Sequence, residues 1–183
     1  MQPHAGTLPE RAACGAFIMK LVILAVGRAR TTPEQQLVSE WLARLPQGGN
    51  LVEVESRLPA GRDRTGDEGK RLLRHVPAGM PLVACDPRGC DTSSEALAAM
   101  LARYRDEGVA TTYFAVGGAD GHADAVLQRA QSRIAFGSAT WPHMLFRAML
   151  AEQLYRAMMI LAGHPYHRCL LYTSDAADDR LSV

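Results

Sequence analysis

Two kinds of apolar pattern alternate along the chain. Short apolar runs, typical of strands buried in a parallel sheet, occur at residues 19–27, 51–55, 81–86, 111–116 and 133–136. Between these runs, apolar residues recur at helical spacing, over residues 33–45, 67–76, 94–107, 122–130 and 144–161. Because strands alternate with helices throughout, the sequence predicts an α/β fold with a mainly parallel sheet and helices on both faces.

Two segments lack this regularity. Residues 57–66 contain Pro59 between three arginines, Arg57, Arg62 and Arg64, and we expect them to form a mobile basic loop. The segment 164–168 follows the last helix, and we expect Pro165 to keep it from being helical.

The two ends differ from the middle of the chain. Residues 1–18 show no periodicity, and we interpret them as a disordered extension ahead of an alternative start at Met19. Residues 169–183 resemble a translated sequencing-adapter remnant, so we interpret them as a non-native or disordered tail. The expected organisation is therefore one domain over residues 19–168.

Composition narrows the class of protein. The 183 residues are 48% hydrophobic and 21% charged, which suits one globular domain. No apolar run is long enough to cross a bilayer, and the four cysteines show no paired spacing, so we expect a cytoplasmic protein with reduced thiols. The net charge of +1 is not that of a general nucleic-acid binder, so such a partner would need a local basic patch.

Candidate chemistry gathers where strands end. The strand ends at Cys85, at Gly117-Gly118 and at residues 137–142 should meet at one edge of the sheet, where open α/β sheets bind ligands. Paired glycines let a ligand approach the backbone, which could hold an adenine through main-chain hydrogen bonds. The alternative is a tight turn that needs glycine for steric reasons alone.

Other cofactor sites fit poorly. The full dinucleotide fingerprint and the phosphate loop with Gly-Lys-Ser/Thr are both absent. Cys85 and Cys90 have no matching second pair, and the histidines are scattered, so we expect no metal site.

The last helix and its tail leave alternatives open. Glu152 and Arg156 are four residues apart and should form a surface ion pair. The apolar positions of this helix wrap more than one stripe, which indicates either a partner subunit or burial within the chain. In the tail, Tyr166, His167 and Arg168 could stack on bases and grip phosphate, or could form an ordinary surface end.

Taken together, residues 19–168 resemble the RlmH family of SPOUT methyltransferases. The resemblance rests on landmarks in order along the chain: Met19-Lys20-Leu21, Ala25-Val26-Gly27, Gly117-Gly118-x-x-Gly121, Pro142-His143, Arg147, Glu152, Tyr155-Arg156-Ala157 and His164-Pro165-Tyr166-His167-Arg168. It implies a carboxyl-terminal trefoil knot and a homodimer. It also implies methylation of N3 of a pseudouridine in the 23S rRNA of the large ribosomal subunit, with S-adenosylmethionine as methyl donor.

The resemblance also assigns site residues. The cofactor positions fall on Cys85, Gly117, Gly118, Phe136, Gly137, Ser138, Ala139, Thr140, Trp141 and Pro142. Cys85 replaces an expected leucine, a mild change. The carboxyl-terminal residues Tyr166, His167 and Arg168 would contact the rRNA or close over the methyl donor. In a dimer, they would do so at the site of the neighbouring subunit.

Catalysis needs N3 aligned with the methyl group and its proton removed. We therefore consider His167 a candidate base and Arg168 a cation that favours the N3 anion. The candidate RNA contacts are Arg57, Arg62, Arg64, Tyr166, His167 and Arg168. For the three arginines of residues 57–66, a solvated loop without a ligand is the alternative. The competing function is a non-catalytic dimeric α/β module that binds a nucleotide or an adenosine-like metabolite.

Overall fold

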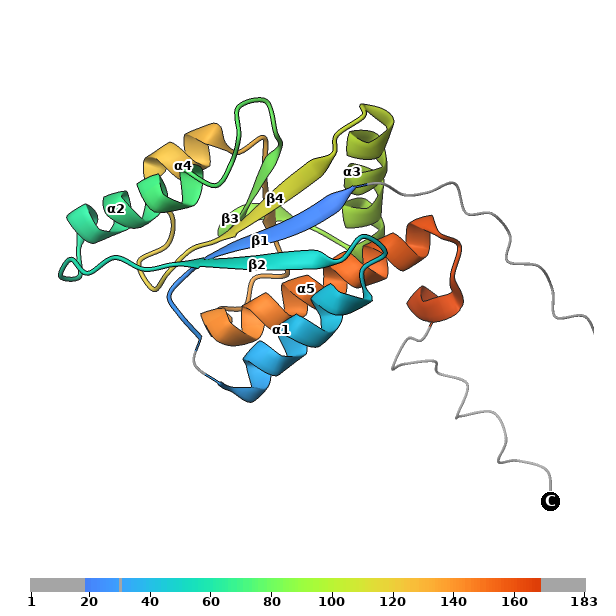
Figure 1. Ribbon diagram of the computed structural model, residues 1–183, viewed down its shortest axis with the longest axis horizontal. Helices are drawn as coiled ribbons and strands as arrows, with labels where there is room; N and C mark the ends of the chain where they lie inside the picture. The colour runs from blue at the N-terminus through green and yellow to red at the C-terminus, as the bar shows by residue number, and fades with distance from the viewer. Residues whose placement is uncertain (1–18, 30, 169–183) are drawn as a thin grey trace, which may run out of the picture.

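The computed structural model describes residues 19–29 and 31–168, and the expectations for residues 1–18 and 169–183 lie outside this part. Five parallel strands form one sheet in the order β2-β1-β4-β3-β5 (Figure 1). The strands are β1 Lys20–Val26, β2 Gly49–Val54, β3 Leu82–Asp91, β4 Thr111–Val116 and β5 Ser132–Ala135. All five carboxyl ends therefore meet at one edge of the sheet.

Helices cover both faces of this sheet (Figure 1). One face carries α1 (Pro33–Arg44), α3 (Ser94–Asp106) and α5 (His143–Leu161). The other carries α2 (Arg62–Leu73) and α4 (Asp124–Arg129). The predicted α/β fold with a parallel sheet is confirmed, whereas the trefoil knot stays a prediction.

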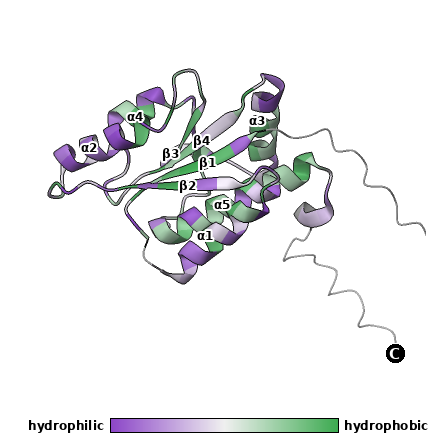
Figure 2. Ribbon diagram, in the orientation of Figure 1, coloured by the Kyte–Doolittle hydropathy of each residue, from purple (hydrophilic) through white to green (hydrophobic). Residues whose placement is uncertain are grey.

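The alternation of β1 explains why its sequence is apolar throughout. Leu21 and Ile23 belong to the core beneath α1, α3 and α5, whereas Val22 and Leu24 belong to the core beneath α2 and α4. Figure 2 shows the contrast between the largely hydrophobic β1 and the largely hydrophilic α2. A strand buried on both faces shows no polar alternation, which is the pattern of a central parallel strand.

Two predictions about irregular segments are wrong. Residues 57–66 are not all loop, because α2 begins at Arg62, where the left-handed φ of +137° at Gly61 turns the chain into the helix. The Arg64 Nε lies 3.0 Å from Glu68 Oε1, an i,i+4 ion pair that stabilises this first part of α2. The tail 164–168 also contains a 3₁₀ turn, η1 (Pro165–Arg168). Proline is tolerated there because the first residue of a turn needs no N–H partner.

A buried arginine ties α5 to the carboxyl ends of β1 and β2. Arg147 is 1% exposed, and its Nη2 donates to the carbonyls of Val26 at 2.6 Å and Gly27 at 2.9 Å. Its Nη1 donates to Glu53 Oε1 at 2.8 Å, and the same oxygen accepts from the Ala29 N–H at 2.8 Å. Three segments far apart in the sequence therefore meet at one guanidinium.

The substitution Glu53→Ala should lower the free energy of unfolding by more than is usual for a partly exposed side chain. It leaves the Arg147 charge buried without its carboxylate, so we expect the free energy of unfolding to fall by about 2–3 kcal/mol. Urea unfolding measures this change. The control is Glu40→Ala, whose side chain is exposed on α1 and should change stability by no more than about 0.5 kcal/mol. Equal effects of the two substitutions would contradict the proposed role of Arg147.

Candidate functional site

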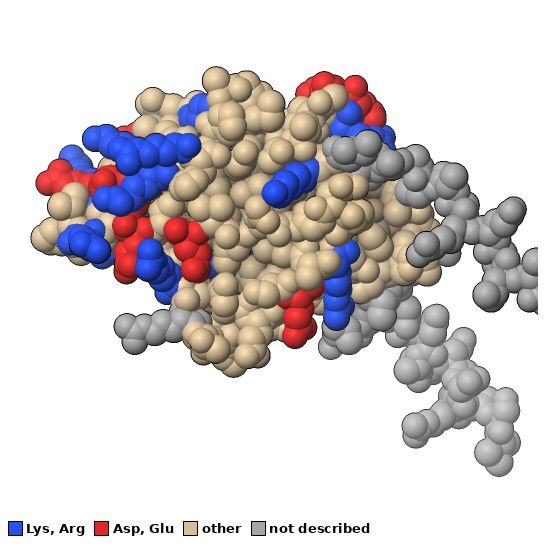
Figure 3. Space-filling view, in the orientation of Figure 1, with Lys and Arg blue, Asp and Glu red and all other residues tan. Residues whose placement is uncertain are grey.

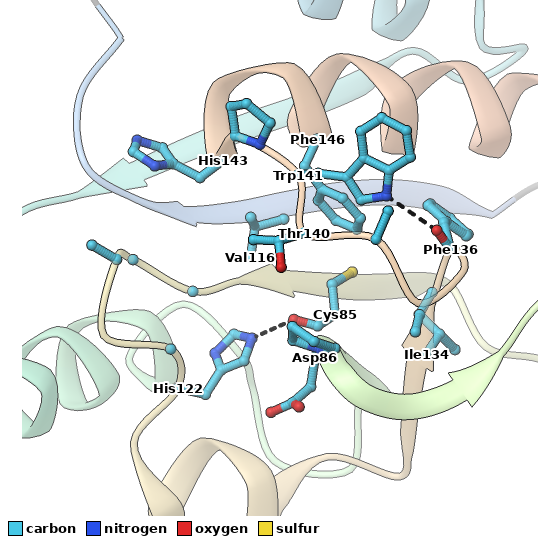
Figure 4. Close-up of a pocket in the computed structure, with 18 of the residues that line it drawn as sticks. Cys85, Asp86, Val116, His122, Ile134, Phe136, Thr140, Trp141, His143 and Phe146 are labelled. Carbon is cyan, nitrogen blue, oxygen red and sulfur yellow. Dashed lines mark hydrogen bonds between the residues drawn. The ribbon is translucent and has the colours of Figure 1, made fainter.

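A pocket lies at the carboxyl ends of β3, β4 and β5. Its volume is about 350 Å³. The side chains labelled in Figure 4 come from the strand ends, from the segment between β4 and α4, from the loop between β5 and α5, and from the first turn of α5. The lining residues are Cys85, Asp86, Pro87, Val116, Gly117, Gly118, Ala119, Gly121, His122, Ile134, Ala135, Phe136, Gly137, Ala139, Thr140, Trp141, Pro142, His143 and Phe146. The expectation that Gly117 and residues 136–142 line one cleft is confirmed, with Ser138 the one assigned residue outside the lining.

Both glycines of the pair are required by close packing. A Cβ on Gly117 would lie 2.9 Å from the carbonyl of Gly121, and one on Gly118 would lie 2.9 Å from Val26 Cγ1. The turn is closed by the Gly121 N–H, which donates to the Gly118 carbonyl at 3.0 Å. The steric reading of the pair therefore holds, and the same absence of side chains leaves main-chain groups facing the pocket.

The loop between β5 and α5 is held in place by three contacts. Trp141 Nε1 donates to the Phe136 carbonyl at 3.1 Å, which draws the loop into a compact ring (Figure 4). The Gly137 N–H donates to Asp91 Oδ1 at 2.8 Å. Phe136 stacks on Phe146 of α5, with ring centroids 5.5 Å apart. This wall of the pocket is therefore built before any ligand arrives.

The opposite wall carries a histidine that sequence reasoning missed. His122 Nε2 lies 3.0 Å from the Cys85 carbonyl, so Nε2 carries the proton and donates (Figure 4). The other ring nitrogen, Nδ1, is buried without a hydrogen-bond partner in the described part of the chain. The sequence did contain an indication of this residue, because His122 directly follows the glycine turn that ends at Gly121. Its position in the wall depends on that turn, which periodicity does not reveal.

Cys85 and Asp86 complete this wall with opposite electrostatic behaviour. Burial raises the pKa of the Cys85 thiol, so Cys85 offers a neutral, apolar surface. Hydrogen bonds from the Arg88 guanidinium lower the pKa of Asp86, whose carboxylate also accepts from the Arg88 N–H at 2.8 Å. A neutral thiol and a fixed anion therefore stand side by side at the end of β3.

The tail containing Tyr166 packs on its own chain, away from this pocket. The Tyr166 ring lies 5.0 Å from that of Tyr155 and 6.1 Å from that of Trp41. Its hydroxyl donates to Glu152 Oε1 at 3.1 Å, and the predicted ion pair between Glu152 and Arg156 is present. The 19 residues of α5 separate the pocket from η1, a span of about 28 Å along the helix axis. The structure therefore does not bring the backbone of residues 167 and 168 to the pocket of the same chain.

The three arginines of residues 57–66 do not act as one group. Arg64 is paired with Glu68, and Arg62 is exposed at the first residue of α2. Arg57 is exposed in a second hollow, at the end of β2. Their shared assignment as RNA contacts stays a prediction, with Arg57 in a setting different from the other two.

Within the described ranges, no group of three or more metal-binding side chains occurs. In the same residues, no helix is long and apolar enough to cross a membrane.

The fold and pocket define a class: an α/β protein with a largely apolar, glycine-lined pocket at the carboxyl edge of a parallel sheet, where such folds bind ligands. Residues 19–167 match the family described as "Predicted SPOUT methyltransferase". The chain belongs to this family of SPOUT methyltransferases.

Similar proteins carry one common name. Proteins named ribosomal RNA large subunit methyltransferase H share 51% identity in Rhodospirillum centenum, 48% in Paramagnetospirillum magneticum and 46% in Xanthobacter autotrophicus. Each alignment covers 82% of this chain and 99% of the relative. A methyltransferase of Legionella pneumophila, solved with S-adenosylmethionine, superimposes with a TM-score of 0.42 at 7% identity, over 78% of this chain and 66% of that one. So distant a likeness bears on neither the fold nor the site.

The buried His122 ring predicts a loss of stability on acidification. Burial lowers its pKa from the ordinary 6.5, so the folded state favours the neutral ring. The unfolded chain therefore binds the proton more readily, and the free energy of unfolding should fall as the pH drops from about 7 to about 5. Asp86 does not contribute in this window, because its lowered pKa costs stability only below about 3.8.

Urea unfolding of the protein and of His122→Gln at pH 7 and pH 5 measures the effect. The glutamine amide can still donate to the Cys85 carbonyl but does not titrate, so the variant should show the smaller change with pH. The same change in both proteins would refute the role given to His122.

Proposed function

We propose that this protein is an S-adenosylmethionine-dependent methyltransferase that acts on the ribosomal RNA of the large ribosomal subunit. The observation that carries the proposal is the alignment with relatives that bear this name, over 99% of their length. The pocket residues lie within residues 19–167, which match the family. The methyl acceptor is N3 of a pseudouridine in 23S rRNA, as the resemblance implies. A ribosomal substrate also favours a cytoplasmic location.

The pocket suits the methyl donor. A volume of about 350 Å³ lies within the range of small-molecule sites. Apolar side chains, among them Val116, Ile134 and Phe136, can enclose an adenine, while the glycine turn leaves N–H and C=O groups to read its edge. The unpartnered Nδ1 of His122 is an acceptor in the same wall. The proposed donor site consists of Cys85, Gly117, Gly118 and residues 136–142.

The reaction requires the protein's own residues only to position the acceptor nitrogen and to remove its proton. S-adenosylmethionine supplies an electrophilic methyl group on a sulfonium sulfur. The protein must hold N3 in line with that carbon and remove the N3 proton, so that an N–C bond replaces the S–C bond. We assign proton removal to His167 and stabilisation of the N3 anion to Arg168.

The length of α5 supports a dimeric site. About 28 Å of helix separates η1 from the pocket of the same chain, which supports a role for His167 and Arg168 at the pocket of a second copy. Large apolar side chains are exposed beside the pocket, with Trp141 40% and Leu145 39% accessible. A homodimer would cover them and bring one tail to the other pocket.

Filling the pocket should abolish binding of the methyl donor. Ala139 lies in the exposed loop that lines it, so Ala139→Trp occupies the cavity without disturbing the core. Calorimetric titration with S-adenosylmethionine should show binding to the protein and none to the variant. The matched control is Ala78→Trp, in the exposed turn between α2 and β3 and outside the pocket lining. This variant should bind S-adenosylmethionine as the wild type does. Unchanged binding of S-adenosylmethionine to Ala139→Trp would contradict the assignment of this pocket as the methyl-donor site.

Mixed dimers test the shared site. We expect His167→Ala/Arg168→Ala and Ala139→Trp each to lower methyl transfer to large subunits by at least about 100-fold. Co-expressed at equal levels, half of the dimers would be mixed, and each mixed dimer would hold one intact pocket facing one intact tail. Activity should then recover to about a quarter of that of the wild type. Without recovery, the tail does not act on the partner's pocket.

A further inference from the structure

A second hollow lies at the same edge of the sheet, where β1 and β2 end against α2. Its volume is about 550 Å³. Figure 3 shows charged side chains gathered at the end of the molecule that carries α2. The lining residues are Arg28, Glu53, Val54, Glu55, Arg57, Arg71, Arg74 and His75. Such a concentration of arginines is notable in a chain whose net charge is +1.

Ion pairs within the protein account for only part of this charge. The Glu53 carboxylate is held by Arg147, and the Arg71 Nε lies 2.7 Å from Asp67 Oδ2. For Arg28, Arg57 and Arg74, no carboxylate lies within ion-pair distance in the part of the chain that the structure describes. The three guanidinium groups therefore line one hollow without a direct ion pair. The carboxylates near them are Glu55 in the lining and Asp67, which interacts electrostatically with Arg74 from a longer distance.

Three converging, solvent-exposed guanidinium groups repel one another unless an anion joins them. Arg28 follows β1, Arg57 follows β2, and Arg74 ends α2, so three separate segments bring them together. Guanidinium groups bind phosphate through two parallel hydrogen bonds, and an exposed site lets a large anion enter. The chemistry of this hollow is that of a phosphate site.

We propose that this hollow binds a backbone phosphate of the RNA substrate, at a distance from the base that receives the methyl group. The proposal rests on the proposed function and identifies where the RNA lies. The ends of β2 and β3 are three strand spacings apart, about 14 Å, so the hollow and the methyl-donor pocket lie along one edge. One short RNA segment can reach both.

The test compares Arg57→Gln/Arg74→Gln with a control of equal charge change, Lys20→Gln/Arg103→Gln. The control residues are exposed near the amino ends of strands, at the opposite edge of the sheet. Large ribosomal subunits without the methyl group serve as the RNA probe, and binding is measured across a series of salt concentrations. Methyl transfer by the wild-type protein and S-adenosylmethionine binding by all three proteins are measured separately.

We expect Arg57→Gln/Arg74→Gln to bind subunits at least about tenfold more weakly at low salt, with a salt-dependence slope smaller by about two. S-adenosylmethionine binding should stay unchanged, and the control should resemble the wild type. Equal weakening in the control, or no weakening in the variant, overturns the phosphate site while methyl transfer by the wild type still supports the enzyme. If the wild type transfers no methyl group, the proposed function fails, and absence of subunit binding then overturns the phosphate site as well.

A second arm separates RNA from a small anion. Inorganic phosphate is titrated into the protein and into Arg57→Gln/Arg74→Gln by calorimetry. Millimolar binding that the variant loses, together with unchanged subunit binding, would assign the hollow to a free anion and contradict the RNA proposal.

Discussion

The buried guanidinium group of Arg147 connects the segments that form the carboxyl edge of the sheet, where the pocket lies. Arg147 contacts the carbonyls that end β1 and the carboxylate of Glu53 on β2, while its own backbone belongs to the second turn of α5. An arginine without these acceptors could not remain buried, because desolvation of an unpaired charge is too costly. The interaction therefore fixes where α5 begins, and with it the loop that forms one wall of the pocket. Gly27 takes part through its left-handed φ of +92°, which turns the chain beneath the guanidinium.

Two hollows of different chemistry lie along this carboxyl edge of the sheet. At the ends of β3, β4 and β5, glycines and apolar side chains line the pocket that we propose as the methyl-donor site. At the ends of β1 and β2, arginines converge in a hollow suited to an anion. Arg147 lies between the two regions, since it follows the pocket residue His143 by one turn and holds Glu53 of the hollow. A parallel sheet makes this possible because every strand delivers its end to the same edge.

Periodicity was sufficient for the layers of the fold. The unbroken apolar run of β1 requires burial on both faces, which the structure shows for every residue from Leu21 to Val26. It was insufficient where local signals conflict with tertiary contacts. Arg62 and Gly66 resemble loop residues, yet burial of Leu72 and the Arg64–Glu68 pair stabilise a helix there.

The site was predicted in part for the same reason. Strand ends with paired glycines indicate a ligand edge, so the meeting of Gly117 with residues 136–142 could be foreseen. Periodicity did not indicate the roles of His122 and Arg147, since each depends on a partner far away in the sequence: the Cys85 carbonyl for one and Glu53 for the other. The placement of Tyr166 against Trp41 and Tyr155 also depends on α1 and α5 lying side by side.

The most direct measurement incubates the purified protein with S-adenosylmethionine and unmethylated large ribosomal subunits, and then locates the new methyl group by mass spectrometry of the digested rRNA. The account predicts one added methyl group, on N3 of a pseudouridine in 23S rRNA. Binding of the methyl donor with no methylated nucleoside, or a methyl group on a different kind of base, would contradict it.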